Sequence, residues 1–345
     1  MKVLVATDAW RPQVNGVVRT YERLAEELPR LGASLDILSP DEYRSLPLPT
    51  LEEIRLAVPD RTYTARRIAQ SAPDAIHLAT EGPVGLMVRA YCRKHLRPFT
   101  TSYHTRFPEY LASRFGIPAG WIYAYQRRFH NASAGTMVAT PSLADTLASR
   151  GFTRLLPWTR GVDGELFHPR PVRRFGQGPV FLYAGRIALE KNLEAFLALD
   201  LPGRKVVVGD GPLRAPLEAR FPDVLFTGTQ FGEDLALSYA SADVFVFPSR
   251  TDTFGIVLLE AIASGVPVAA YPVTGPRDIV NPGISGVLSE DLRAAALSAL
   301  DLDRRRLAAE AARFTWAGAA RLFLDNIAAA HRLRAAPEET RTRGS

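Results

Sequence analysis

Short apolar runs alternate with longer amphipathic stretches along most of the chain. In the first half, strands are predicted at 2–8, 34–40, 75–80 and 99–104, and amphipathic helices at 17–32 and 82–96. The pattern restarts after residue 178, with strands predicted at 179–185, 204–211, 224–228, 242–249 and 266–271. Nearly continuous apolar strands are typical of a sheet covered on both faces. The alternation therefore predicts an α/β protein with parallel sheets.

Two such patterns in 345 residues favour two domains, since the chain is long for one core. The stretch 159–179 is rich in Pro, Gly and Arg and has no period, which is typical of a linker. We expect two Rossmann-like domains facing a central cleft, at 1–165 and 166–315. A helix at 316–333 is expected to return to the first domain, followed by a disordered tail at 334–345.

Composition narrows the class of protein. The chain is 47% hydrophobic and 23% charged, which is ordinary for a globular enzyme. Its single cysteine, Cys92, excludes an internal disulfide framework and fits a reducing compartment. No apolar run is long enough for a transmembrane helix, and the first apolar stretch is too short for a signal peptide. We therefore expect a cytoplasmic protein.

The loop after the first predicted strand, 8–20, is a candidate phosphate site. It passes through Asn15 and Gly16 into a helix. Gly16 has no Cβ to block a ligand, and a helix N-terminus offers N–H groups and partial positive charge to an anion. The alternative is a simple turn before a helix. Neither this loop nor 209–214 has the dinucleotide fingerprint, which disfavours a nicotinamide-dependent oxidoreductase.

A second candidate loop carries two cations. Arg186 follows a predicted strand and Lys191 lies five residues later, and two converging cations can hold a diphosphate. The alternative is that both are solvated surface charges. Only four of the 42 basic residues are lysine, which weighs against that alternative for Lys191.

Two carboxylates in the segment 249–270 form the third candidate. Asp252 lies in a turn before a predicted helix, which it could merely cap. Glu260 lies within that helix among apolar neighbours, so it is predicted to be buried, and a buried carboxylate needs hydrogen-bond donors. The two hydroxyls of a ribose are suitable donors; a buried arginine is the alternative partner.

These motifs together resemble the family 4 glycosyltransferases, which have the GT-B fold. The resemblance is carried, in the family's order, by NGVVRT, SYHTRFPEY, GVDGELFHP, GRIALEKN, GDGP and PSRTDTFGIVLLEAIASGVPVAA. The family's E-x7-E element corresponds to Asp252 through Glu260, with Asp at its first position. The resemblance implies an acceptor domain at 1–165, a nucleotide-sugar domain at 166–315 and a retaining hexosyltransferase.

The resemblance also implies roles for individual residues. Glu260 would hold the donor ribose, and Asp252 would hold hydroxyls of the donor sugar together with the backbone of Phe254, Gly255 and Ile256. Arg186 and Lys191 would neutralise the leaving diphosphate without a metal ion or other cofactor. Gly16 would let its loop approach the same phosphates. His104 would lie near the sugar; taken alone, it would be interpreted instead as a structural histidine at a strand end.

Aromatic and basic residues alternate in 106–133, including Trp121, Tyr125, Arg127 and Arg128. This mixture suits contact with an anionic membrane surface. The alternative is a helix with core aromatics and solvated arginines. The resemblance extends to bacterial enzymes that glycosylate lipids, so we expect a lipid acceptor, with diacylglycerol favoured, and a peripheral position on the inner face of the cytoplasmic membrane. The expected donor is UDP-glucose, UDP-glucuronate or GDP-mannose; a GDP-mannose-dependent α-mannosyltransferase acting on a phosphatidylinositol-type or polysaccharide acceptor is the alternative.

Two further classes of function stay open. A nucleotide-sugar 2-epimerase would consume donor without any acceptor. A noncatalytic nucleotide-binding protein would not need His104, Arg186, Lys191 and Glu260 together. No nucleic-acid partner is expected.

Overall fold

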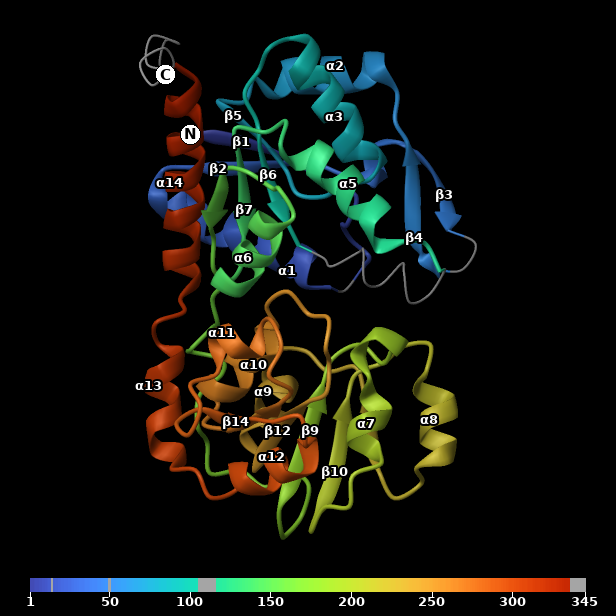
Figure 1. The fold of residues 1–345 in the computed structure, drawn as a ribbon, viewed down its shortest axis with the longest axis vertical. Coiled ribbons are helices and arrows are strands. Elements are labelled where there is room, and N and C mark those ends of the chain that lie inside the picture. The colour runs from blue at the N-terminus through green and yellow to red at the C-terminus, as the bar shows by residue number, and fades with distance from the viewer. Residues whose placement is uncertain (14, 49–50, 105–115, 336–345) are drawn as a thin grey trace. The chain divides into compact units, whose positions relative to one another are not determined.

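The computed structural model describes residues 1–13, 15–48, 51–104 and 116–335, and the chain divides into two compact units (Figure 1). Unit 1 comprises Met1–Thr159 and Trp316–Ser345, and unit 2 comprises Arg160–Thr315. Each unit is described below by itself.

The described part of unit 1 contains a six-stranded parallel sheet in the order β2-β1-β5-β6-β7-β8. Its strands are β1 (Lys2–Ala6), β2 (Ser34–Leu38), β5 (Ala75–Leu78), β6 (Thr100–Tyr103), β7 (Gly135–Val138) and β8 (Leu155–Pro157). Its α-helices are α1 (Gly16–Glu27), α2 (Arg61–Ser71), α3 (Pro83–Lys94), α5 (Ala119–His130), α6 (Pro141–Ser149) and α14 (Trp316–Ala335). Short 3₁₀ turns follow α1 and β2, at Leu28–Leu31 and Pro40–Glu42.

The described part of unit 2 repeats this plan, with the parallel order β11-β10-β9-β12-β13-β14. Its strands are β9 (Val180–Ala184), β10 (Arg204–Val208), β11 (Leu225–Gly228), β12 (Val244–Phe247), β13 (Val268–Ala270) and β14 (Gly286–Leu288). Its α-helices are α7 (Leu193–Leu197), α8 (Arg214–Arg220), α9 (Gly232–Ala240), α10 (Ile256–Ala263), α11 (Pro276–Ile279), α12 (Leu292–Ala299) and α13 (Leu307–Ala311). Short 3₁₀ turns lie at Leu189–Lys191 and Arg304–Arg306.

The central strands are buried along their whole length, because helices cover both faces of each sheet. All residues of β5, β9 and β12 are buried. Residues that alternate along β12 contribute to one core cluster with helices α7 and α12, as Val244 and Val246 do. Each predicted strand therefore corresponds to an observed one, with ends that are up to three residues shorter, whereas β7, β8 and β14 were not predicted.

The boundary between the units differs slightly from the sequence expectation. Unit 2 begins at Arg160, whereas the first domain was expected to run to residue 165. Val162 forms a bridge with Thr315, and its N–H donates to the Phe314 carbonyl at 3.0 Å. This pairing joins the segment at Val162 to the segment at Phe314 and Thr315, and both segments belong to unit 2. Figure 1 shows α14 beside the sheet of unit 1, where its Phe323 and Ile327 are buried in the core. Of the predicted tail, residues from 336 onward lie outside the described part.

An antiparallel hairpin in unit 1 was not predicted. It consists of β3 (Arg44–Leu48) and β4 (Leu51–Val58). Leu46 and Val58 are exposed on it, whereas Ala57 is buried. The apolar residues of this hairpin therefore do not all face a core, so their periodicity gave no strand signal.

Candidate functional site

The sheet order of unit 2 places two candidate loops next to each other. Strand order reverses between β9 and β12, which are neighbours in the sheet. Ligands of open α/β sheets bind outside the carboxyl ends of the strands at such a switch point. Arg186 follows β9 and Asp252 follows β12. The fold thus brings the second and third candidates of the sequence to one edge of the sheet.

Lys191 and Asp252 form an ion pair that the sequence did not predict. Lys191 Nζ donates to Asp252 Oδ1 at 2.6 Å, and the two side chains are 26% and 19% exposed. Burial raises the pKa of Asp252, but the charge and hydrogen bond of Lys191, with a smaller contribution from the Ser249 hydroxyl, outweigh burial and lower that pKa below its ordinary value. The other oxygen, Oδ2, is buried and has no hydrogen-bond partner among the described residues. An ionised oxygen in that position is an acceptor ready for a ligand hydroxyl.

Helix α10 carries Glu260 and begins after Gly255, which has no side chain to cap it. Asp252 accepts from Lys191 at Oδ1, and its Oδ2 accepts from no described group, so it makes no bond to the start of the helix. The alternative that Asp252 merely caps this helix is therefore wrong. Glu260 is 1% exposed, as its apolar neighbours predicted. The hydroxyl of Tyr239, on α9, donates to Glu260 Oε2 at 3.0 Å. Tyr239 thus helps to orient the carboxylate, and no motif pointed to it.

The GDGP loop holds the Arg186 loop in place. A Cβ at Gly209 would lie 1.9 Å from the carbonyl oxygen of Gly185, and a Cβ at Gly211 would lie 2.4 Å from that of Ile187. The Ile187 N–H also donates to the Asp210 carbonyl at 2.8 Å. These glycines serve close packing of two backbones beside Arg186, since any side chain there would clash.

In unit 1, part of the expected phosphate site at α1 is already occupied. The side chain of Asn15 accepts hydrogen bonds from the N–H groups of Val17 and Val18, at 3.0 and 3.1 Å. These two groups are therefore not available to an anion, which corrects the expectation of free N–H groups there. A Cβ on Gly16 would meet nothing within 4 Å, so the space beside the backbone is open in the described structure.

His104 follows β6 and is linked to the interior of unit 1. Its Nε2 lies 3.1 Å from the hydroxyl of Tyr21, which in turn lies 2.9 Å from Nε2 of His77. Tyr21 and His77 are fully buried. The His104 ring also meets the ring of Trp158 edge-on, with centroids 5.9 Å apart.

The carboxyl ends of β1 and β5 carry a polar network that the sequence did not reveal. Asp8 accepts from the N–H groups of Val84 and Gly85 at the start of α3, and burial, opposed by these bonds, raises its pKa. Glu81 pairs with the buried ring of His130 at 2.9 Å. Asp8 thus does the work of a helix cap for α3, whose own N-cap, a glycine, has no side chain.

Helix α5 exposes aromatic residues on its surface. Trp121 is 75% exposed and Tyr125 is 45% exposed, so the alternative that these two are core residues is wrong. Arg127 and Arg128 are also exposed, whereas Tyr123 on the same helix is buried. Residues 106–115 of the predicted membrane segment lie outside the described residues.

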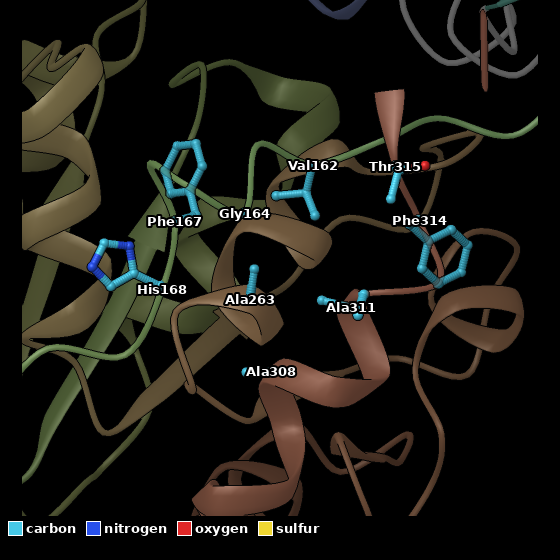
Figure 2. Close-up of a pocket in the computed structure, with 10 residues that line it drawn as sticks. Val162, Gly164, Phe167, His168, Ala263, Ala308, Ala311, Phe314 and Thr315 are labelled. Carbon is cyan, nitrogen blue, oxygen red and sulfur yellow. The ribbon is translucent and has the colours of Figure 1, made fainter. Parts of the chain in front are cut away.

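A small apolar pocket of about 230 Å³ lies within unit 2 (Figure 2). Val162, Phe167, Ala263 and Phe314 are among its lining residues. Ala263 lies one turn after Glu260 on α10, but none of the predicted donor-binding residues lines the pocket. With so few polar groups, the pocket does not suit a nucleotide sugar.

Within the described residues, no three or more His, Cys, Asp or Glu side chains gather where a metal ion could bind. None of the helices described is both long enough and apolar enough to cross a bilayer.

Two family models match the chain. The model described as Glycosyltransferase Family 4 matches residues 14–166, and the one described as Glycosyl transferases group 1 matches residues 178–302. The chain is 32% identical over 320 residues to the GDP-mannose-dependent alpha-mannosyltransferase of Mycobacterium tuberculosis, covering 84% of this chain and 83% of that protein. It is 25% identical to the alpha-monoglucosyldiacylglycerol synthase of Streptococcus pneumoniae, covering 87% and 78%.

Solved structures agree on the fold. Sucrose-phosphate synthase from Thermosynechococcus elongatus superposes with a TM-score of 0.75 at 20% identity, covering 98% of this chain and 100% of that one. An Anabaena protein in complex with UDP superposes with a TM-score of 0.70 at 14% identity, covering 95% and 100%. The chain is thus a glycosyltransferase with the GT-B fold and belongs to glycosyltransferase family 4.

Proposed function

We propose that this enzyme transfers a mannosyl unit from GDP-mannose to a lipid acceptor with retention of anomeric configuration. Three relatives at 31–32% identity, each covered over more than four fifths of its length, bear the name GDP-mannose-dependent alpha-mannosyltransferase. The observation that carries the donor site is the Lys191–Asp252 pair at the switch point of unit 2, with a buried carboxylate oxygen that has no described partner.

Each donor-binding residue has a role that its surroundings support. Asp252 Oδ2 accepts from a hydroxyl of the sugar, with the backbone of Phe254, Gly255 and Ile256 alongside. Glu260, held by Tyr239, accepts from the ribose hydroxyls.

The leaving group is stabilised by cations of the chain. Arg186 and Lys191 face the charge that grows on the diphosphate as the bond to the sugar breaks. Lys191 therefore serves two partners, the diphosphate and Asp252, and the bond to Asp252 fixes where its ammonium group lies. Because these cations replace a metal ion, we expect activity to persist in EDTA; complete loss that magnesium restores would contradict this role.

Retention follows because the acceptor oxygen attacks the same face of the sugar from which the leaving group departs. The bond between C1 of the sugar and the diphosphate oxygen breaks, and a bond between C1 and the acceptor oxygen forms on the same side. The proton of the acceptor hydroxyl passes to the departing phosphate oxygen. Retaining glycosidases instead use two carboxylates about 5–5.5 Å apart, and no such pair is assigned beside His104. NMR of the product tests this step, since an inverted anomeric proton would refute it.

The acceptor side is supported by the surface of unit 1. Trp121 and Tyr125 on α5 and Leu86 on α3 are exposed. Arg89, on α3, donates to the backbone carbonyls of Phe129 and Arg128, so the two helices lie side by side. Exposed aromatic and apolar groups beside arginines suit the interface of an anionic membrane, where a lipid acceptor resides.

A second candidate is glucosyl transfer to diacylglycerol, favoured by the similarity to the Streptococcus pneumoniae synthase. A donor screen separates the two. GDP-mannose, UDP-glucose, UDP-glucuronate and UDP-galactose are each incubated with phosphatidylinositol, diacylglycerol and a membrane extract, and products are identified by mass spectrometry. We expect a mannosylated lipid; a product only from a UDP-sugar refutes the donor, and donor consumption without acceptor indicates an epimerase.

A further inference from the structure

Three side chains of unit 1 form a hydrogen-bonded chain that ends at His104. Tyr21 lies on α1, His77 on β5 and His104 directly after β6. The Tyr21 hydroxyl lies between the two histidines, 3.1 Å from Nε2 of His104 and 2.9 Å from Nε2 of His77. One phenol thus contacts a ring nitrogen of each histidine.

The inner end of this chain is anchored in β6. Nδ1 of His77 lies 2.7 Å from the Thr100 hydroxyl, and Nε2 lies 2.9 Å from the Ser102 hydroxyl. His77 is fully buried, and its ring meets those of Trp158 and Phe323 edge-on. The ring therefore has hydrogen-bond partners at both nitrogens and packed neighbours around it, so its position is fixed.

Tyr21 is held equally firmly. It is fully buried, and its ring packs against Trp158 at a centroid distance of 6.1 Å. Trp158 is fixed in turn by its Nε1–H bond to the Ala319 carbonyl on α14, at 3.1 Å. Because α1, Trp158 directly after β8, and α14 together set the place of the Tyr21 hydroxyl, that hydroxyl is a rigid reference point for the ring of His104.

Two arrangements of the protons fit the contacts of Tyr21 with the two histidines. In the first, His77 Nε2–H donates to Tyr21, the Tyr21 hydroxyl donates to His104 Nε2, and Thr100 donates to His77 Nδ1. In the second, His104 Nε2–H donates to Tyr21, the Tyr21 hydroxyl donates to His77 Nε2, and His77 Nδ1–H donates to Thr100. A protonated His104 fits the second arrangement. A phenol can exchange its donor and acceptor roles in place, so His104 keeps the same partner whether its ring is neutral or charged.

We propose that Tyr21 is a positioning residue for the transfer reaction, holding the ring of His104 in one orientation through its hydroxyl, with His77 as the inner anchor. This inference rests on the proposed function, together with the expectation from the family resemblance that His104 lies near the donor sugar. A ring held from one nitrogen presents a fixed edge to the reacting centre, and a loss of that orientation weakens stabilisation of the transition state more than binding of the donor.

The test compares Tyr21→Phe with Tyr103→Phe in the full chain. Both remove one hydroxyl from a fully buried ring of unit 1 and keep its volume. Tyr103 bonds Gln126 at 3.2 Å and packs on His130, on the opposite face of β6 from Ser102. Tyr21→Phe should lower kcat about tenfold, the upper end of the effect of losing one ordinary hydrogen bond, with donor KM within about twofold of wild type. Tyr103→Phe should leave kcat near the wild-type value.

A second readout does not depend on activity. The nitrogen-15 NMR signals of the His104 ring report which nitrogen carries a proton. The Nε2 signal should move in Tyr21→Phe and stay in Tyr103→Phe. If it does not move in Tyr21→Phe, the contact is not formed and the proposal is overturned. If it moves but kcat equals that of the control, Tyr21 does not position His104 for the reaction, which also overturns it.

Failure of the proposed function gives a different result. In that case wild-type enzyme transfers no sugar from any donor tested, while the NMR comparison still reports on the contact. Should Tyr21→Phe not fold, His77→Gln tests the inner anchor of the hydrogen-bonded arrangement. This variant should lower kcat and move the nitrogen-15 signal of His104 in the same direction. If kcat and the signal are both unchanged, the proposed arrangement is refuted.

Discussion

Replacing Lys191 with methionine should show how much the Lys191–Asp252 ion pair contributes to the stability of the folded protein. At 2.6 Å and an effective dielectric constant of about 20, the bare attraction is roughly 6 kcal/mol, most of it offset by desolvation. Removing one partner of a fully buried pair costs about 3–5 kcal/mol, and an exposed pair contributes about 0.2–1 kcal/mol. The side chains of this pair are 26% and 19% exposed, so the pair lies between these limits. We therefore expect Lys191→Met to lower the free energy of unfolding by about 2 kcal/mol.

The loss should depend on pH in a defined direction. Lys191 lowers the pKa of Asp252 in the folded protein below its value of 3.8 in the unfolded chain. The pair therefore stabilises the fold fully above that value, and this stabilisation disappears as the pH falls through the lower, folded pKa. The difference in stability between wild type and Lys191→Met should be full at pH 7 and should narrow below about pH 4.

Differential scanning calorimetry of the full chain measures this effect. About 2 kcal/mol corresponds to a fall in unfolding temperature of about 4–8 °C for a domain of this size. The matched control is Lys191→Met with Asp252→Asn, which removes the buried carboxylate as well and should recover part of the loss. If Lys191→Met unfolds at the wild-type temperature at pH 7, or if the difference grows at low pH, the ion pair does not have the role assigned here.

Three further perturbations test the site and the surface. Glu260→Gln should weaken binding of GDP about 10- to 100-fold as measured by calorimetry, since a charge-assisted bond to the ribose contributes about 1.5–3 kcal/mol. Tyr239→Phe should weaken it less. Unchanged GDP affinity in Glu260→Gln would make that carboxylate purely structural. Arg186→Ala should lower kcat as well as donor affinity, because charge on the diphosphate grows in the transition state; full turnover at saturating donor would refute the assignment. The double variant Arg127→Glu with Arg128→Glu should no longer float with anionic liposomes, since each arginine contributes about 1 kcal/mol to binding at such a surface. Its activity on a soluble short-chain acceptor should be retained. Flotation equal to that of wild type would contradict the membrane contact.

The sequence predicted features that depend on neighbours along the chain. Continuous apolar runs indicated both parallel sheets, because strands covered on two faces need apolar residues at every position. The apolar residues around Glu260 predicted its burial, which the structure confirms at 1% exposure. The combination of motifs indicated the family that the comparisons establish. The hairpin of β3 and β4 escaped prediction because Leu46 and Val58 do not follow a buried face.

Pairings between distant residues were decided only by the tertiary structure. Lys191 and Asp252 are 61 positions apart and meet because β9 lies beside β12, an order that no local pattern encodes. Tyr21 and His104 are 83 positions apart and meet because α1 packs against the sheet near the end of β6. Periodicity records which face of an element is buried, but the partner on that face depends on strand order and on the packing of helices against the sheet.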